Sequence, residues 1–134
     1  MSNRSEAWHV VGLFNWGELN DENDSSPSKD IAVRVEKLGL NDEQTYLAYE
    51  FWSRKFLGTV RRKLSVEVPS HQVAVVPLKP RRDHPQFLSR NRHISQGATD
   101  IVRIRWAAPI KTLRGLSAVV EGFHHRYTIA IPRG

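Results

Sequence analysis

The sequence contains no cysteine and no long uninterrupted apolar run. The absence of cysteine excludes disulfides, thiolate nucleophiles and thiolate metal ligands. The apolar run that opens at Trp8 is broken by Asn15 and Gly17, and no basic segment with a small-residue cleavage site precedes it. We therefore expect neither a signal peptide nor a membrane span. These features do not specify the compartment, although they favour a cytoplasmic location.

Motifs of the common catalytic and cofactor sites are also missing. The sequence has no GxSxG elbow, P-loop, GxGxxG or HExxH pattern. Of its six histidines, His124 and His125 are adjacent, and adjacent strand residues point to opposite faces of a sheet. No spacing marks a pair of catalytic carboxylates either. We expect no metal, no cofactor and no catalysis by the isolated chain.

Charge is distributed unevenly along the chain. Residues 1–52 carry four Lys or Arg against ten Asp or Glu, a net charge of −6, whereas residues 53–134 carry sixteen against four, a net charge of +12. The basic half raises nucleic acid as a partner, with Arg61, Arg62, Arg81 and Arg82 as the candidate residues. Because most other basic residues occur singly at alternating positions, a solvated face explains the pattern as well, and we do not expect nucleic acid as the partner.

The stretch 64–78, LSVEVPSHQVAVVPL, is the centre of the predicted fold. Apolar and polar residues alternate in its first arm, which is typical of a strand with one buried face. A bend at Pro69-Ser70-His71 and a second apolar run from Val73 predict a hairpin. The second arm is apolar on both sides, so we expect a central strand that ends at Pro77 and Pro80.

Short alternating segments recur along the rest of the chain. They predict further strands at Trp8–Trp16, Lys29–Val35, Ile101–Trp106, Leu113–Val120 and His125–Ile131. The last three are expected to form a meander, with a turn at Glu121-Gly122-Phe123 and with Val102, Ile104 and Trp106 pointing inward.

The segment 41–57 fits two interpretations. Asn41 followed by Gln44 could cap a helix, but the aromatic-rich stretch Tyr49–Trp52 favours a strand, and we predict a strand, separated by Gly58 from the next segment.

About eight short strands with frequent turn signals predict an all-β fold. We expect one antiparallel β-sandwich domain with Greek-key-like connections over residues 1–134, and an open barrel is the alternative. Its ordered core spans 8–132, with a polar loop at 17–28 and a long connection at 79–100 that carries a strand piece at Gln86–Leu88.

Aromatic residues are the remaining candidates for a binding surface. Trp16 and Trp52 lie at predicted strand ends, where an indole face can remain exposed and stack on a sugar ring, while Trp8 and Trp106 are expected to pack inside. Side chains beside them could bond sugar hydroxyls, namely Asn15, Glu50 and Arg105.

Several phrases, in this order, resemble the C-terminal β-sandwich that follows the catalytic barrel in α-galactosidases and related raffinose-synthase-like glycoside hydrolases of the melibiase group. The resemblance covers Trp8 to Pro132. It is carried by VVGLFNW (10–16), LGL (38–40), YEFW (49–52), VEVPSHQVAVVPL (66–78) and PQFLSRNRHISQGA (85–98).

The resemblance implies an accessory role for this chain. Such hydrolases carry their catalytic aspartates on a (β/α)₈ barrel, which this sequence does not encode, so no catalytic residue is carried over. The expected partner is a catalytic (β/α)₈ domain or another protein chain. Trp52, Phe56, Arg103 and Arg105 are the candidate contact residues. The alternative is a stand-alone carbohydrate-binding module that holds a galactoside-type oligosaccharide on Trp16 or Trp52.

Overall fold

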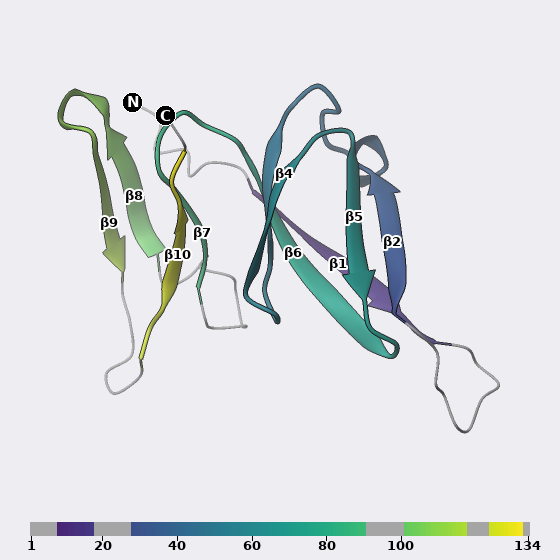
Figure 1. Cartoon of the computed structure of the whole chain (residues 1–134). Helices are drawn as coiled ribbons and strands as arrows, with labels where there is room; N and C mark the ends of the chain where they lie inside the picture. Colours follow the sequence, from purple (N-terminus) through teal and green to yellow (C-terminus); the bar gives the residue numbers. More distant parts are fainter. Residues whose placement is uncertain (1–7, 18–27, 91–100, 118–123, 133–134) are drawn as a thin grey trace. The chain divides into compact units, whose positions relative to one another are not determined.

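The computed structural model describes residues 8–17, 28–90, 101–117 and 124–132 (Figure 1). By their internal contacts these residues divide into two compact units. The N-terminal unit is Trp8–Arg81, and the described part of the C-terminal unit runs from Arg82 to residue 132. The single domain expected for residues 1–134 stays a prediction.

Secondary structure in the described ranges is almost entirely β. The strands of the N-terminal unit are β1 (His9–Asn15), β2 (Lys29–Arg34), β3 (Tyr46–Glu50), β4 (Lys55–Val60), β5 (Lys63–Val68) and β6 (Gln72–Pro80). Those of the C-terminal unit are β7 (Gln86–Arg90), β8 (Ile101–Ala107), β9 (Thr112–Ser117) and β10 (Tyr127–Ala130). Two short 3-10 turns, η1 (Val35–Leu38) and η2 (Ala108–Ile110), are the helical structure among these residues, and none of it could span a membrane. The all-β prediction is confirmed.

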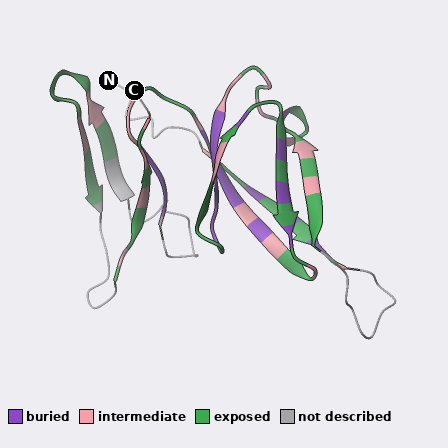
Figure 2. Cartoon of the chain, in the orientation of Figure 1, coloured by how far each residue is buried: buried purple, intermediate pink, exposed green. Residues whose placement is uncertain are grey.

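The N-terminal unit is a sandwich of two antiparallel sheets. One has four strands in the order β1-β6-β3-β4, and the other pairs β2 with β5. Alternate residues of each strand point between the sheets and form one apolar core, seen as the buried segments in Figure 2. Its fully buried members include Val35, Leu64, Val68, Val76 and Leu78. Burying each such side chain contributes about 1.5–3 kcal/mol, so the shared core holds the two sheets together.

The expected hairpin at 64–78 is wrong, although both of its strands exist. β5 pairs with β2, whereas β6 pairs with β1 and β3 in the other sheet. The bend at Pro69-Ser70-His71 is therefore an arch that carries the chain from one sheet to the other. His71 adopts a left-handed conformation, with φ of 57°, where the chain turns. Alternation identified the buried face of each arm, but it does not specify the strand with which an arm pairs.

β6 is a central strand that ends at Pro80, as predicted. Pro77 does not end it, because the strand continues through this residue. The pairing of β6 with β3 stops at Ala48 opposite Leu78. The following pair would place Tyr49 opposite Pro77, which has no N–H to donate to a neighbouring strand.

The segment 41–57 contains a strand, as predicted, at Tyr46–Glu50. Asn41 does not cap a helix. Its side-chain Oδ1 instead accepts a hydrogen bond from the Glu43 N–H (2.9 Å) in a turn before the strand. Gly58 does not end a segment either: β4 runs through it at φ of 91°, and the β3–β4 register skips Leu57, which is a β-bulge.

The C-terminal unit contains two antiparallel pairs, β8 with β9 and β10 with β7. The expected meander is therefore wrong in its last step, because β10 pairs with a strand inside the predicted long connection 79–100. Ile104 was expected to point inward but is exposed, whereas Trp106 is half-buried and stacks on His84 with ring centroids 5.1 Å apart. The expected turn at 121–123 lies outside the described residues.

Candidate docking face of the N-terminal unit

The four-stranded sheet is apolar on its outer face as well as on its inner face. Along β1 the inward residues alternate with Val10, Gly12 and Phe14, and both sets are apolar or small. The register places these three residues opposite members of β6 with the same outward direction, namely Pro77, Val75 and Val73. On the same side of the sheet Pro77, Leu47 and Tyr49 are buried, so only part of this side is accessible. We define the outer face as the accessible part, which consists of Val10, Phe14, Val73, Val75 and Phe56 together with the two exposed tryptophans that follow β1 and β3, Trp16 and Trp52.

The end of β1 carries a stacked aromatic pair. The rings of Phe14 and Trp16 are nearly parallel, with centroids 5.2 Å apart and an interplanar angle of 8°. Gly12 leaves room for this arrangement, because a Cβ built on it would lie 3.2 Å from the Phe14 ring. Trp16 is 73% exposed and Phe14 is 53% exposed, so the pair presents a flat apolar surface.

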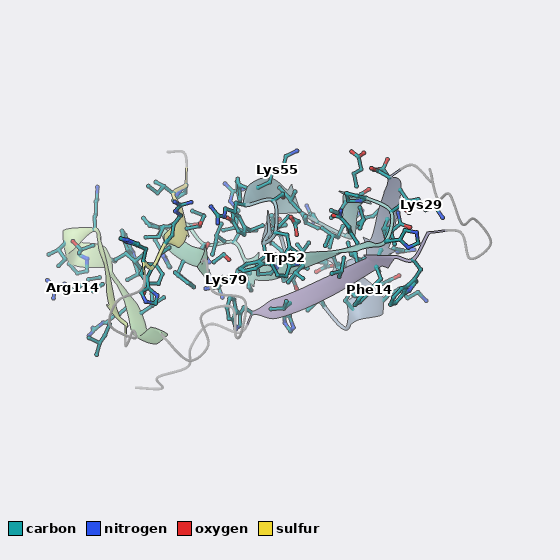
Figure 3. The ribbon with its side chains drawn as sticks, turned by 90° about the horizontal axis from the view of Figure 1, so that it is seen from below. Phe14, Lys29, Trp52, Lys55, Lys79 and Arg114 are labelled. Atoms are coloured by element: carbon teal, nitrogen blue, oxygen red, sulfur yellow. The ribbon has the colours of Figure 1, made fainter. Side chains whose placement is uncertain are left out.

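A second aromatic group lies at the β3–β4 turn (Figure 3). Trp52 is 58% exposed and packs edge-on against the buried Phe51, with centroids 4.9 Å apart. Phe56 follows on β4, opposite Tyr49, and is 50% exposed. The Phe51 N–H donates to the Val75 carbonyl (2.9 Å), which fixes this turn against β6. Exposed aromatic side chains therefore occur on β1, on β4 and at the turn between β3 and β4.

A buried carboxylate shapes the turn that presents Trp52. Glu50 is 7% exposed, and its Oε1 accepts hydrogen bonds from the N–H groups of Trp52 (3.1 Å) and Val75 (3.2 Å). Its Oε2 accepts from both the N–H (2.6 Å) and the hydroxyl (2.5 Å) of Ser53. The carboxylate thus replaces the backbone pairing that β3 cannot continue beside Pro77.

Two opposing effects act on the pKa of Glu50. Desolvation by burial raises it, whereas the hydrogen bonds from Ser53, Trp52 and Val75 lower it. Together the hydrogen bonds prevail, and the pKa of Glu50 lies below its ordinary value of 4.5. Glu50 is therefore an anion that accepts hydrogen bonds from the backbone of the turn and of β6.

The two-stranded sheet has a polar outer face. Its exposed outward residues are Asp30, Ala32 and Arg34 on β2, opposite Glu67, Ser65 and Lys63 on β5. Arg34 Nε also lies 3.0 Å from a carboxylate oxygen of Glu36. Charged residues of both signs are typical of a solvated surface, so the unit has one outer face suited to water and one suited to a partner.

The structure separates the residues that the sequence suggested for sugar binding. Trp16 and Trp52 are exposed, but Asn15 and Glu50 beside them are buried and engaged. Asn15 donates from Nδ2 to the Val68 carbonyl (2.9 Å) and accepts at Oδ1 from the Gly17 N–H (3.0 Å). The expectation that these two side chains bond sugar hydroxyls is therefore wrong. Instead, Asn15 ties the end of β1 to β5 in the other sheet.

Of the remaining candidates, Arg103 and Arg105 belong to the C-terminal unit and Trp8 belongs to the N-terminal unit. Arg105 is exposed on β8, and Arg103 lies on the same strand, its side chain being outside the described part. Trp8 is half-buried in the N-terminal unit, where the Lys79 ammonium lies 5.2 Å from its ring centroid. No group of three or more His, Cys, Asp or Glu side chains that could hold a metal ion is found in the described ranges.

Alternation alone could have located the outer face. In VVGLF (10–14) both the odd and the even positions are apolar or small, which is the pattern of a strand covered on both sides. Val10 and Phe14 were not among the residues predicted to be exposed, although this pattern includes both. The role of Glu50 had a weaker signal, a Glu followed three residues later by Ser53 at a strand end.

Comparison with known proteins agrees with the sandwich. The family described as the alpha galactosidase C-terminal beta sandwich domain matches residues 1–78, which ends close to the boundary of the N-terminal unit. The match does not reach Pro85–Ala98, the segment that extended the resemblance beyond this unit.

A solved β-L-arabinopyranosidase of family GH27 from Geobacillus stearothermophilus, in complex with arabinose, is similar at 26% identity with a TM-score of 0.46. The similarity covers 58% of this chain and 16% of that chain. No curated protein matches. Since the family match spans more than half of the sequence, the chain belongs to the family of α-galactosidase C-terminal β-sandwich domains.

Proposed function

We propose that this chain is a non-catalytic accessory module of a glycoside hydrolase, which packs the outer face of its four-stranded sheet against a catalytic (β/α)₈ domain. The observation that carries the proposal is the polarity difference between the two outer faces of one sandwich. A charged face needs no cover, whereas an apolar face with Val10, Phe14, Trp52 and Phe56 about half exposed gains stability when a partner removes it from water.

Family membership supports a catalytic domain as the occupant. A domain described as C-terminal in α-galactosidases follows a catalytic region in those enzymes. Aromatic residues are enriched in the cores of protein interfaces because they bury large rigid surfaces at low entropic cost. The Glu50 hydrogen bonds hold the Trp52 turn in place before binding, which lowers the cost of ordering it on contact.

The test is binding to a barrel from the α-galactosidase group that is produced without its own C-terminal sandwich. Association is measured by calorimetry and by co-elution in gel filtration. Phe56→Asp places a charge on the apolar outer face, and Ser65→Asp places the same charge on the polar outer face. We expect Phe56→Asp to weaken binding at least about tenfold, as for loss of an interface aromatic, and Ser65→Asp to leave it unchanged. Equal effects of the two variants, or no association of the unaltered chain, would contradict the proposal.

A second candidate is carbohydrate binding on the Phe14–Trp16 pair. The specific observation is the exposed, parallel ring pair at the end of β1. Titration with galactosides should then change tryptophan fluorescence, and Trp16→Ala should abolish the change while the far-ultraviolet circular dichroism is preserved. A response retained in Trp16→Ala would exclude this pair as the site.

A further inference from the structure

The C-terminal unit lies beyond the family match and contains a basic hairpin, β8–β9. Residues 101–120 carry Arg103, Arg105, Lys111 and Arg114 and no acidic residue. The register places Arg105 directly opposite Arg114, with Ala107 and Leu116 as neighbours on the same face of the hairpin. Trp106 points to the other face, where it stacks on His84.

The opposed arginines are an unfavourable pair in isolation. Side chains directly opposite on antiparallel strands have Cβ atoms about 4.5–5.5 Å apart, so two like charges there repel. An acidic neighbour would usually compensate, but within the described ranges no hydrogen bond or ion pair involves either guanidinium. An anion between them would convert the repulsion into two charge-assisted interactions.

A hollow of about 400 Å³ adjoins these two side chains. It is lined by Arg105, Ala107, Arg114, Gly115 and Leu116, and Gly115 contributes no side chain to fill it. A volume of this order lies at the small end of ligand sites, which span roughly 300–1,000 Å³. The two arginine side chains thus line a recess whose walls are mainly apolar. Figure 3 labels Arg114 on this hairpin.

We propose that this hollow binds a small organic anion, whose carboxylate or phosphate group is held between Arg105 and Arg114 while its body lies against Ala107 and Leu116. A guanidinium offers paired N–H donors that match the paired oxygens of carboxylate and phosphate. The walls supply apolar contact for the rest of the ligand. The site is independent of the proposed docking face, because all of its residues belong to the β8–β9 hairpin.

The proposal is tested by nuclear magnetic resonance titration of the full chain with three probes that share one ring: galactose, galacturonate and galactose 6-phosphate. We expect saturable amide shifts at Arg105–Leu116 with the two acidic probes and none with galactose. The ratio of the two acidic affinities tells carboxylate from phosphate. Shifts that do not saturate, or that galactose also produces, would overturn the proposal.

Charge-matched variants separate a site from general attraction. Arg105→Gln and Arg114→Gln should each weaken binding of the better acidic probe about tenfold or more, the effect of losing one charge-assisted hydrogen bond. Lys111→Gln removes the same charge at the tip of the same hairpin, outside the lining of the hollow, and should have little effect. A loss with Lys111→Gln equal to that with Arg105→Gln would overturn the proposal.

Two further measurements complete the test. A single-stranded oligonucleotide that binds more tightly than the small probes, with an affinity falling steeply with salt, would identify an extended phosphate-binding face instead of a small-anion site. Phe56→Asp should leave the titrations unchanged, so that failure of the docking proposal and failure of the anion site remain distinguishable.

Discussion

The two outer faces of the N-terminal sandwich are built on strands of similar length yet differ in polarity. Strands β2 and β5 alternate, with apolar residues inward from Ile31 onward and charged or small residues outward. Strands β1 and β6 instead carry apolar or small residues on both sides of the sheet, from Val10 to Phe14 and from Val73 to Leu78. Since the core needs only the inward set, the accessible outward residues Val10, Phe14 and Val73 are not explained by folding of this unit. The difference separates what stabilises the sandwich from what prepares it for a partner.

The largest expected effect on the free energy of unfolding comes from a substitution on the core-facing side of β6. Leu78 is fully buried on β6, and Leu78→Ala should lower the free energy of unfolding by about 2–5 kcal/mol, since it loses apolar burial and leaves a cavity. Val75→Ala, on the outward side of the same strand, should cost about 1 kcal/mol or less because the site is already half in contact with water. Urea unfolding of both variants measures the difference. Equal losses would mean that the outer face is already part of the core.

The next effect concerns the link between the two sheets. Asn15→Ala removes the hydrogen bond to the Val68 carbonyl and leaves a buried acceptor without its partner, which should cost about 1–3 kcal/mol. The measurement is again urea unfolding, with Asn15→Asp as the isosteric control that keeps the acceptor for Gly17 but loses the Nδ2 donor. An unchanged midpoint in both variants would show that the bond does not hold the sheets together.

The third effect tests Glu50 at the edge of the apolar face. Its pKa is lowered in the folded chain. The stabilisation by the carboxylate is therefore present above the ordinary pKa of 4.5 and is lost as the pH falls through the lower folded-state pKa. Glu50→Gln should cost about 2 kcal/mol near neutral pH, as expected for lost hydrogen bonds to a charged group.

The thermal midpoint of each protein between pH 2 and pH 7 measures this effect. The difference between Glu50→Gln and the unaltered chain should shrink as the pH falls below the folded-state pKa. A difference that stays constant over the whole range would show that the charge of Glu50 is irrelevant and that only its shape matters.

The smallest expected effect on stability comes from a substitution on the docking face, where a loss of binding without a loss of stability would distinguish a partner surface from a structural role. Trp52→Ser removes an exposed ring, and it should change the free energy of unfolding by no more than about 0.5 kcal/mol, as is usual for surface positions. Binding to the catalytic barrel should nevertheless weaken. A variant that unfolds readily would assign Trp52 to the structure of the turn rather than to a partner surface.

Much of the fold followed from alternation, because a buried face imposes a period of two on any strand. This period identified β1, β2 and β8 and separated the strand at Tyr46–Glu50 from a helical alternative. The pairing of the strands could not be predicted in this way, because alternation does not specify which strand lies beside another. In the structure β5 pairs with β2, and β10 pairs with β7.

Parts of the candidate face could also be predicted. Aromatic residues at strand ends identified Trp16 and Trp52 as candidates for exposure, which the structure shows. Whether they form a binding site stays a prediction. Glu50 could not be assigned from sequence, because its role depends on Val75 and Pro77, which are distant in the chain and adjacent only in the folded sheet.

The arch at Pro69-Ser70-His71 has a consequence for how the chain folds. Among the described strands of the N-terminal unit, only β3 and β4 pair as sequential neighbours. β1 pairs with the much later β6, with His9 opposite Leu78. Such distant pairing requires closure of a long loop before its contacts form, and folding rates fall as the mean sequence separation of contacts rises. On the ribosome, β1 therefore remains without its partner until nearly the whole unit has been synthesised, and its doubly apolar strand is the segment most in need of protection during that interval.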